Sequence, residues 1–118
     1  MEFEPSARTQ ELHARLSDFI RDRVDPAGAI HREQVRASGD PHFHPPVMEE
    51  LKAEARDRGL WNLFLPDADV GAGLTTLEYA PLCELMGQSP LSQEATNCSA
   101  PDTGNMELLA KFATPFQR

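Results

Sequence analysis

The stretch from Gly59 to Gly87 constrains the fold more than any other part of the chain. It contains the only Trp and the only Tyr, and its densest apolar run, residues 60–65, is interrupted only by Asn62. At roughly 25 cal/mol per Å² of apolar area, burial of this run stabilises the fold more than any other local feature. A lone strand would have no partner for its hydrogen bonds. We therefore expect a buried, extended or turn-like crossing between two helices.

The segment before the crossing is predicted to be a helix over residues 46–58. It opens with a proline pair, and proline is tolerated in a first helical turn. Val47, Leu51 and Ala55 recur at helical spacing and form its apolar stripe. Gly59 followed by Leu60 predicts a Schellman stop, with the leucine folded back on the last turn.

The segment after the crossing is predicted to be a loop and then a helix over residues 76–86. Thr75 and Glu78 have the spacing of a capping box, which satisfies backbone donors at a helix start. Pro81 lies inside this helix and predicts a kink, because it removes one backbone hydrogen bond. The loop residues Gly71-Ala-Gly73 favour phosphate binding only weakly, since the preceding strand and the other motif positions are missing.

An earlier helix is predicted over residues 6–24, with Ser6 as its N-cap and Asp25-Pro26 as its stop. Its apolar stripe consists of Leu12, Leu16, Phe19, Ile20 and Val24. Prolines and glycines punctuate residues 26–46, which we expect to form a partly helical connector.

The last part of the chain predicts one complete helix and the start of another. After a polar stretch over 89–101, expected to be irregular, a helix is predicted over 103–113 with Asp102 or Thr103 as its cap. Thr114, Pro115 and Gln117 then have the pattern of a second capping box with proline at the first helical position. Only one residue follows, so we expect a truncated chain.

Composition excludes several classes of function. The 118 residues suffice for one domain, and the net charge of -8 argues against nucleic-acid binding, which needs a basic patch. No window has the roughly 18 apolar residues of a membrane span. Residues 1–5 lack the basic and apolar leader of a secretion signal. Cys83 and Cys98 are expected to be buried free thiols of a cytoplasmic protein rather than a disulfide.

No residue pattern predicts a catalytic, cofactor-binding or metal site. His42 and His44 alternate as two ligands on a strand would, but no third ligand lies in register. Cys98 lacks a neighbouring base that would activate a nucleophile. The residues by themselves predict an all-α domain without visible catalytic machinery.

Three segments resemble the N-terminal helical domain of acyl-CoA dehydrogenases. They are Gly-Leu-Trp-Asn-Leu-Phe-Leu-Pro (59–66), Gly-Ala-Gly-Leu-Thr-Thr-Leu-Glu-Tyr-Ala-Pro-Leu (71–82) and Asn-Cys-Ser-Ala-Pro-Asp-Thr-Gly-Asn-Met-Glu (97–107). More narrowly, they resemble the branch whose eukaryotic members are fused to a kinase-like phosphotransferase domain. The family loop Gly-Gly-x-Gly-Leu reads Val-Gly-Ala-Gly-Leu here. The resemblance covers essentially the whole chain and implies an orthogonal bundle of about five or six helices.

The resemblance also implies a larger enzyme. In the family, FAD lies between a middle β-domain, a C-terminal helical bundle and usually a partner subunit, so a homo-oligomer is expected. A glutamate of the C-terminal bundle removes the α-proton of an acyl-CoA, and electron transfer flavoprotein reoxidises the flavin; related flavoproteins use oxygen instead. This chain matches none of these parts, and neither Glu84 nor Glu107 is assigned the role of the base. We expect the chain alone to be inactive and free of FAD.

The family's N-terminal domain contributes one wall of the acyl pocket. By position, the resemblance assigns that wall to Asn97, Ser99, Asp102, Thr103, Asn105 and Met106, with help from residues 76–86. Alternatively, these polar groups only cap the helix over 103–113 and fasten the loop before it. A rival of another class is a stand-alone helical interaction module without catalysis. The domain interpretation predicts an exposed apolar patch, with Phe112 and Phe116 as candidates.

Overall fold

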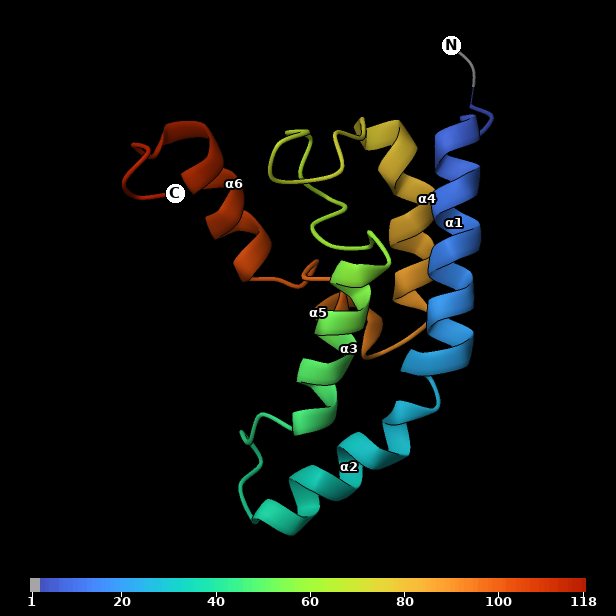
Figure 1. Ribbon diagram of the computed structural model, residues 1–118, viewed down its shortest axis with the longest axis vertical. Helices are drawn as coiled ribbons and strands as arrows, with labels where there is room; N and C mark the ends of the chain where they lie inside the picture. The colour runs from blue at the N-terminus through green and yellow to red at the C-terminus, as the bar shows by residue number, and fades with distance from the viewer. Residues whose placement is uncertain (1–2) are drawn as a thin grey trace.

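The computed structural model describes residues 3–118, which contain helices and no strand (Figure 1). The elements are α1 (Ala7–Phe19), the π-helix η1 (Ile20–Val24), α2 (Ala27–Ser38), α3 (Pro46–Asp57), α4 (Thr76–Gly87), α5 (Ser92–Ala95) and α6 (Asp102–Phe112). The all-α prediction is confirmed. The expectation about a leader falls partly on Met1 and Glu2, which lie outside the described residues. None of the described helices is both long and apolar enough to cross a membrane.

The first helix begins and buries its apolar stripe as predicted. The Ser6 hydroxyl accepts a hydrogen bond from the Thr9 N–H at 3.1 Å. All five residues of the predicted stripe are buried. The last turn is wider than an α-helix, because the Asp25 N–H bonds to the Ile20 carbonyl five residues back, at 2.9 Å. Apolar spacing alone does not distinguish this wider turn from an α-helix.

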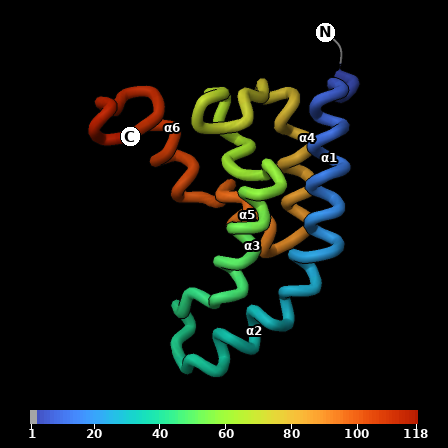
Figure 2. The backbone as a smooth tube through the Cα atoms, viewed as in Figure 1, coloured from blue at the N-terminus to red at the C-terminus, as the bar shows by residue number. Residues whose placement is uncertain are grey.

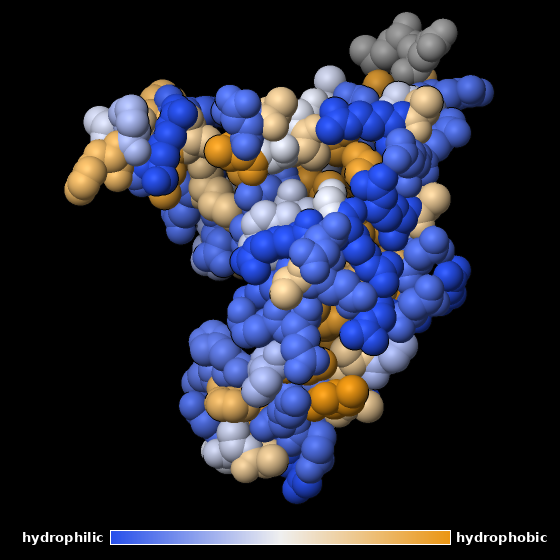
Figure 3. All heavy atoms as spheres, viewed as in Figure 1, coloured by the Kyte–Doolittle hydropathy of each residue, from blue (hydrophilic) through white to orange (hydrophobic). Residues whose placement is uncertain are grey.

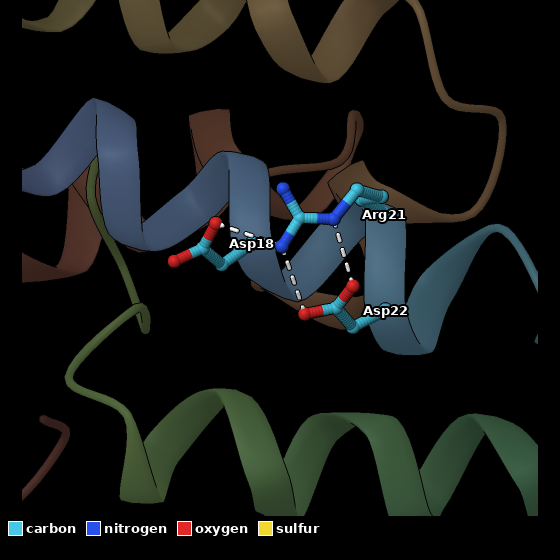
Figure 4. A network of polar contacts seen from close by, with 3 residues as sticks. All are labelled: Asp18, Arg21 and Asp22. Atoms are coloured by element: carbon cyan, nitrogen blue, oxygen red, sulfur yellow. Dashed lines mark hydrogen bonds and ion pairs between the residues drawn. The ribbon is translucent and has the colours of Figure 1, made fainter.

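The opposite face of α1 and η1 is charged and exposed (Figure 4). The Arg21 guanidinium lies between two carboxylates, with its Nη2 3.0 Å from Asp18 Oδ1 and its Nε 2.8 Å from Asp22 Oδ1. These pairs raise the pKa of Arg21 and lower that of Asp22, chiefly through the hydrogen bond between the two side chains. Because water screens exposed ion pairs, this network contributes little to stability.

Residues 27–38 form the helix α2 and residues 39–45 are not helical, so the prediction of a partly helical connector is confirmed. Pro26 starts this helix instead of interrupting the chain, since a proline at a helix start leaves no further donor unsatisfied. Gly39 ends the helix with a φ of 72°. Ala27 is the buried residue of α2, and Ile30 is exposed. The helix projects from the body of the molecule (Figure 2), so it buries little of its surface.

The predicted Schellman stop and the buried crossing are both present. The Leu60 N–H bonds to the Ala55 carbonyl at 2.8 Å, and the Gly59 N–H bonds to the Arg56 carbonyl at 3.1 Å. Leu60, Leu63 and Leu65 are buried, while the backbone between them forms bends and turns. The crossing lies between α3 and the loop that leads to α4, as Figure 1 shows.

Helices α1 and α4 lie side by side (Figure 1). Residues at the start of α1 also form hydrogen bonds with the capping box of α4. The Thr75 hydroxyl accepts from the Glu78 N–H, and the Glu78 carboxylate accepts from the Thr75 N–H, each at 3.1 Å. Ser6 and Thr9 of the α1 start donate to Glu78 Oε2 and to the Glu78 carbonyl, at 3.0 and 3.1 Å. The Thr75 backbone bond is the largest cause of the lowered pKa of Glu78. Pro81 lies inside α4 as predicted, and its kink stays a prediction.

Two expectations for the end of the chain are wrong, and a third is met only in part. The four-residue helix α5 lies inside the stretch predicted to be irregular. Pro101 is the N-cap of α6 without a side-chain hydrogen bond, so neither Asp102 nor Thr103 is the cap; the helix already begins at Asp102. The second capping box is half formed. Gln117 Oε1 accepts from the Thr114 N–H at 3.0 Å, but the Gln117 N–H bonds to the Thr114 carbonyl in a turn.

Candidate functional site

Two asparagines connect the buried crossing to the segment before α6. Asn97 Nδ2 donates to Asn62 Oδ1 at 2.7 Å, and the Asn62 N–H donates to the Thr96 carbonyl at 3.1 Å. Both asparagines adopt the left-handed backbone conformation, with φ of 57° for Asn62 and 59° for Asn97. Asparagine visits this conformation more readily than other residues with a Cβ. We call Asn62 and Asn97 the asparagine pair.

The asparagine pair also contacts the loop before α4 and the first turns of α6. Asn62 Nδ2 donates to the Val70 carbonyl at 3.0 Å. Asn97 Nδ2 lies 3.3 Å from the Met106 sulfur. The pair therefore fixes three segments relative to one another: the crossing, the loop over 67–73 and α6.

A hollow of about 200 Å³ lies between α6 and these segments, and we call it the α6 hollow. Its wall is mostly apolar, formed by Leu65, Val70, Met106, Leu109 and Ala110, with Asn62 among its polar members. Arg118 also lines it and donates from Nη2 to the Ala110 carbonyl at 2.5 Å. A small apolar hollow with few polar groups is the usual form of a site for part of an apolar ligand.

The structure brings together two of the six residues assigned to a pocket wall. Met106 lines the α6 hollow, and Asn97 contacts Met106. Ser99 and Thr103 are half-buried and joined by a backbone hydrogen bond of 3.3 Å, whereas Asp102 and Asn105 are exposed. Asn62 was not selected as a site residue. Its position as the single polar residue of an apolar run is the feature that could have revealed it.

The helix α6 presents an exposed apolar face. It contains no buried residue, and Leu108, Leu109 and Phe112 are 58%, 45% and 78% exposed. Phe116, just after the helix, is 97% exposed, so the predicted exposure of Phe112 and Phe116 is confirmed. In Figure 3, this arm of the molecule carries apolar residues interleaved with hydrophilic ones. Single exposed apolar residues are common, but a group on one helix indicates an interaction surface.

The two cysteines and the histidine pair provide no reactive centre. Both thiols are free; Cys83 is exposed, which makes the expectation of burial wrong for this residue, because it lies on the outer side of α4. Burial raises the pKa of the half-buried Cys98 thiol, which keeps it protonated and unreactive. His42 and His44 are exposed. Within residues 3–118, no three His, Cys, Asp or Glu side chains are placed to hold a metal ion.

Replacing Asn97 separates the two roles of this residue. Asn97→Gly keeps the left-handed backbone accessible but removes the amide, and we expect a loss of about 1 kcal/mol in the free energy of unfolding. Asn97→Ala also removes the amide but keeps a Cβ in that conformation without the local hydrogen bonding that lets asparagine adopt it, so we expect it to cost about 1–2 kcal/mol more than Asn97→Gly. Urea denaturation measures both, with the exposed Asn105→Ala as a control that stays within about 0.5 kcal/mol of the original. Equal stability of Asn97→Gly and the original chain would show that the asparagine pair is energetically neutral.

Comparison with known proteins finds relatives that are named acyl-CoA dehydrogenases. No family model matches the chain. The chain is 51% identical over its whole length to "Probable acyl-CoA dehydrogenase FadE2" of Mycobacterium tuberculosis, and covers 29% of that protein. It is 45% identical over 96% of its length to "Acyl-CoA dehydrogenase family member 10" of Mus musculus, and covers 11% of that protein. The chain therefore spans less than a third of either relative.

A solved structure agrees with the sequence relatives. The "Structure of a putative acyl-CoA dehydrogenase from Mycobacterium abscessus" superposes on this fold with a TM-score of 0.83 and 42% identity. The match covers 97% of this chain and 30% of the other. Both the fold and the sequence are thus shared over nearly all of the chain. Over nearly its whole length, the chain is therefore homologous to part of acyl-CoA dehydrogenases.

Proposed function

We propose that the chain is the N-terminal helical domain of a FAD-dependent acyl-CoA dehydrogenase. The full enzyme would oxidise the α,β bond of an acyl-CoA thioester and pass electrons to electron transfer flavoprotein. The observation that carries the proposal is similarity over the whole chain to relatives that are more than three times longer. On this proposal, the purified 118-residue chain binds no flavin tightly and has no activity.

The exposed apolar face of α6 supports the proposal. Leu108, Phe112 and Phe116 present apolar surface to water at an energetic cost of roughly 25 cal/mol per Å². In the longer protein, the remaining domains would cover this face and remove that cost. A stand-alone interaction module would instead keep the face for a separate partner protein.

Within the full enzyme, we propose that residues 97–106 form one wall of the acyl pocket. Met106 and the α6 hollow provide apolar surface, and Asn97 provides a fixed polar group beside it. Asp102 and Asn105 are exposed in this chain, so they are free to face a substrate or another domain. The capping alternative does not explain Asp102, because its side chain makes no cap hydrogen bond.

The substitution Asp102→Ala in the longer enzyme tests the pocket wall. We expect the ratio of kcat/KM for a polar-substituted and a plain acyl-CoA to change by about tenfold, with the thermal midpoint nearly unchanged. Asp57→Ala, which removes an exposed aspartate at the end of α3, is the matched control and should leave the ratio as it was. Lost stability with an unchanged ratio would contradict the pocket wall and restore a purely structural role.

A further inference from the structure

We propose that a second hollow, beside α1, binds a small organic phosphate of nucleotide size. It has a volume of about 350 Å³ and lies between α1 and the turns on either side of the buried crossing. Arg8, Glu11, Arg15, Gly59, Trp61 and Ala72 are among the residues that line it. We call it the arginine hollow. It shares no lining residue with the α6 hollow and is independent of the proposed enzyme function.

Two guanidinium groups are held at this hollow by backbone carbonyls. Arg8 and Arg15 are seven residues apart on α1, which places them on the same face about 10 Å apart along the helix. Arg8 Nη2 donates to the Ala72 carbonyl, and Arg15 Nη1 donates to the Arg58 carbonyl at 3.3 Å. These bonds reduce the side-chain freedom that binding would otherwise have to restrict. Each guanidinium has five N–H donors, so donors remain for a ligand.

The charge around the hollow suits an anion. The chain carries a net charge of -8, yet Arg8 and Arg15 line this hollow and Arg56 lies beside it. Glu11 lines it too and is paired with Arg15 Nη2 at 2.6 Å, so two guanidinium groups face one carboxylate and the lining keeps an excess of positive charge. The planar fork of a guanidinium matches two oxygens of a phosphate, which makes such hydrogen bonds short and strong.

The size and the aromatic wall favour a phosphate that carries a planar ring. Trp61 lines the hollow, and the Arg56 guanidinium covers its ring with Cζ 3.9 Å from the ring centroid. This contact holds the indole in place, because a cation is attracted to an aromatic face. Nucleobases stack readily on aromatic side chains. A volume of about 350 Å³ is far more than inorganic phosphate fills, and it falls within the range of small-molecule sites.

Titration of the ¹⁵N-labelled chain with AMP tests the proposal. Trp61 is the only tryptophan, so its indole N–H gives one assigned resonance inside the hollow. We expect saturable shifts of this resonance with AMP, and affinities about tenfold weaker for adenosine or for inorganic phosphate alone. No saturable shift with AMP would overturn the site. Equal affinity for inorganic phosphate would overturn the contact with the ring.

Substitution of the arginines locates the binding. Arg8→Gln removes the fork at one end of the hollow, and we expect AMP to bind about tenfold more weakly. Arg36→Gln, on α2 and paired with Glu33, is the matched control and should leave the affinity unchanged. Circular dichroism verifies that each variant is folded, and Arg15→Gln replaces Arg8→Gln if the latter loses helix. Unchanged AMP affinity in the folded variant would overturn the assignment to this hollow.

Discussion

Phe19→Ala is expected to lower the free energy of unfolding by about 3–5 kcal/mol. Phe19 is 0% exposed and lies at the junction of α1 and η1, where it is among the largest fully buried side chains. Its removal loses the transfer free energy of a phenyl ring and leaves a cavity that the surrounding helices fill only in part. A domain of this size has a total stability of about 5–15 kcal/mol, so the change removes a large share of it.

The same substitution at an exposed position provides the control. Phe112 is 78% exposed on α6, and Phe112→Ala is expected to change stability by less than about 0.5 kcal/mol. Urea denaturation followed by circular dichroism measures both variants under identical conditions. If the two variants lost equal stability, the core would not be centred on α1 as the structure shows.

Gly71→Ala is expected to destabilise the chain by about 3 kcal/mol. A Cβ at this position would lie within 2.5 Å of the Leu65 carbonyl oxygen and closer still to the Leu65 Cβ. Leu65 is buried at the end of the crossing, so it cannot move away without displacing its neighbours. The loop over 67–73 would have to shift, and with it the Val70 carbonyl that accepts from Asn62.

Gly104→Ala is the matched control for Gly71→Ala. Gly104 lies inside α6, and a Cβ there meets no heavy atom within 4 Å. Because alanine has a higher helix propensity than glycine, this variant is expected to gain about 0.5–1 kcal/mol. Thermal unfolding of the two variants should therefore shift in opposite directions. A harmless Gly71→Ala would show that the loop is looser than its packing against Leu65 indicates.

Local sequence patterns determined most of the helical architecture. Ser6, Thr75 and Gly59 were identified as caps and a stop because their hydrogen bonds join residues only a few positions apart, and the structure confirms all three. The apolar stripe of α1 was equally predictable, since burial of one helix face produces a regular spacing. The family was likewise recognised from three short segments of sequence.

Tertiary structure decided the features that depend on distant residues. The asparagine pair joins positions 35 residues apart, and the Ser6 to Glu78 hydrogen bond joins positions 72 apart. No local pattern encodes either contact, because each depends on how the crossing and the helices pack. The arginine hollow arises in the same way, since α1 meets the turns around Trp61 only in the folded chain.

The wrong predictions also concern features that local sequence patterns do not determine. Asp102 and Thr103 were misassigned as caps of α6. Which of several adjacent residues is the cap depends on where the preceding loop ends and the helix begins. The sequence by itself determined most of the helical segments and their apolar faces, through interactions a few residues long. Only the tertiary structure decided which polar groups meet, because those contacts exist only after the core has formed.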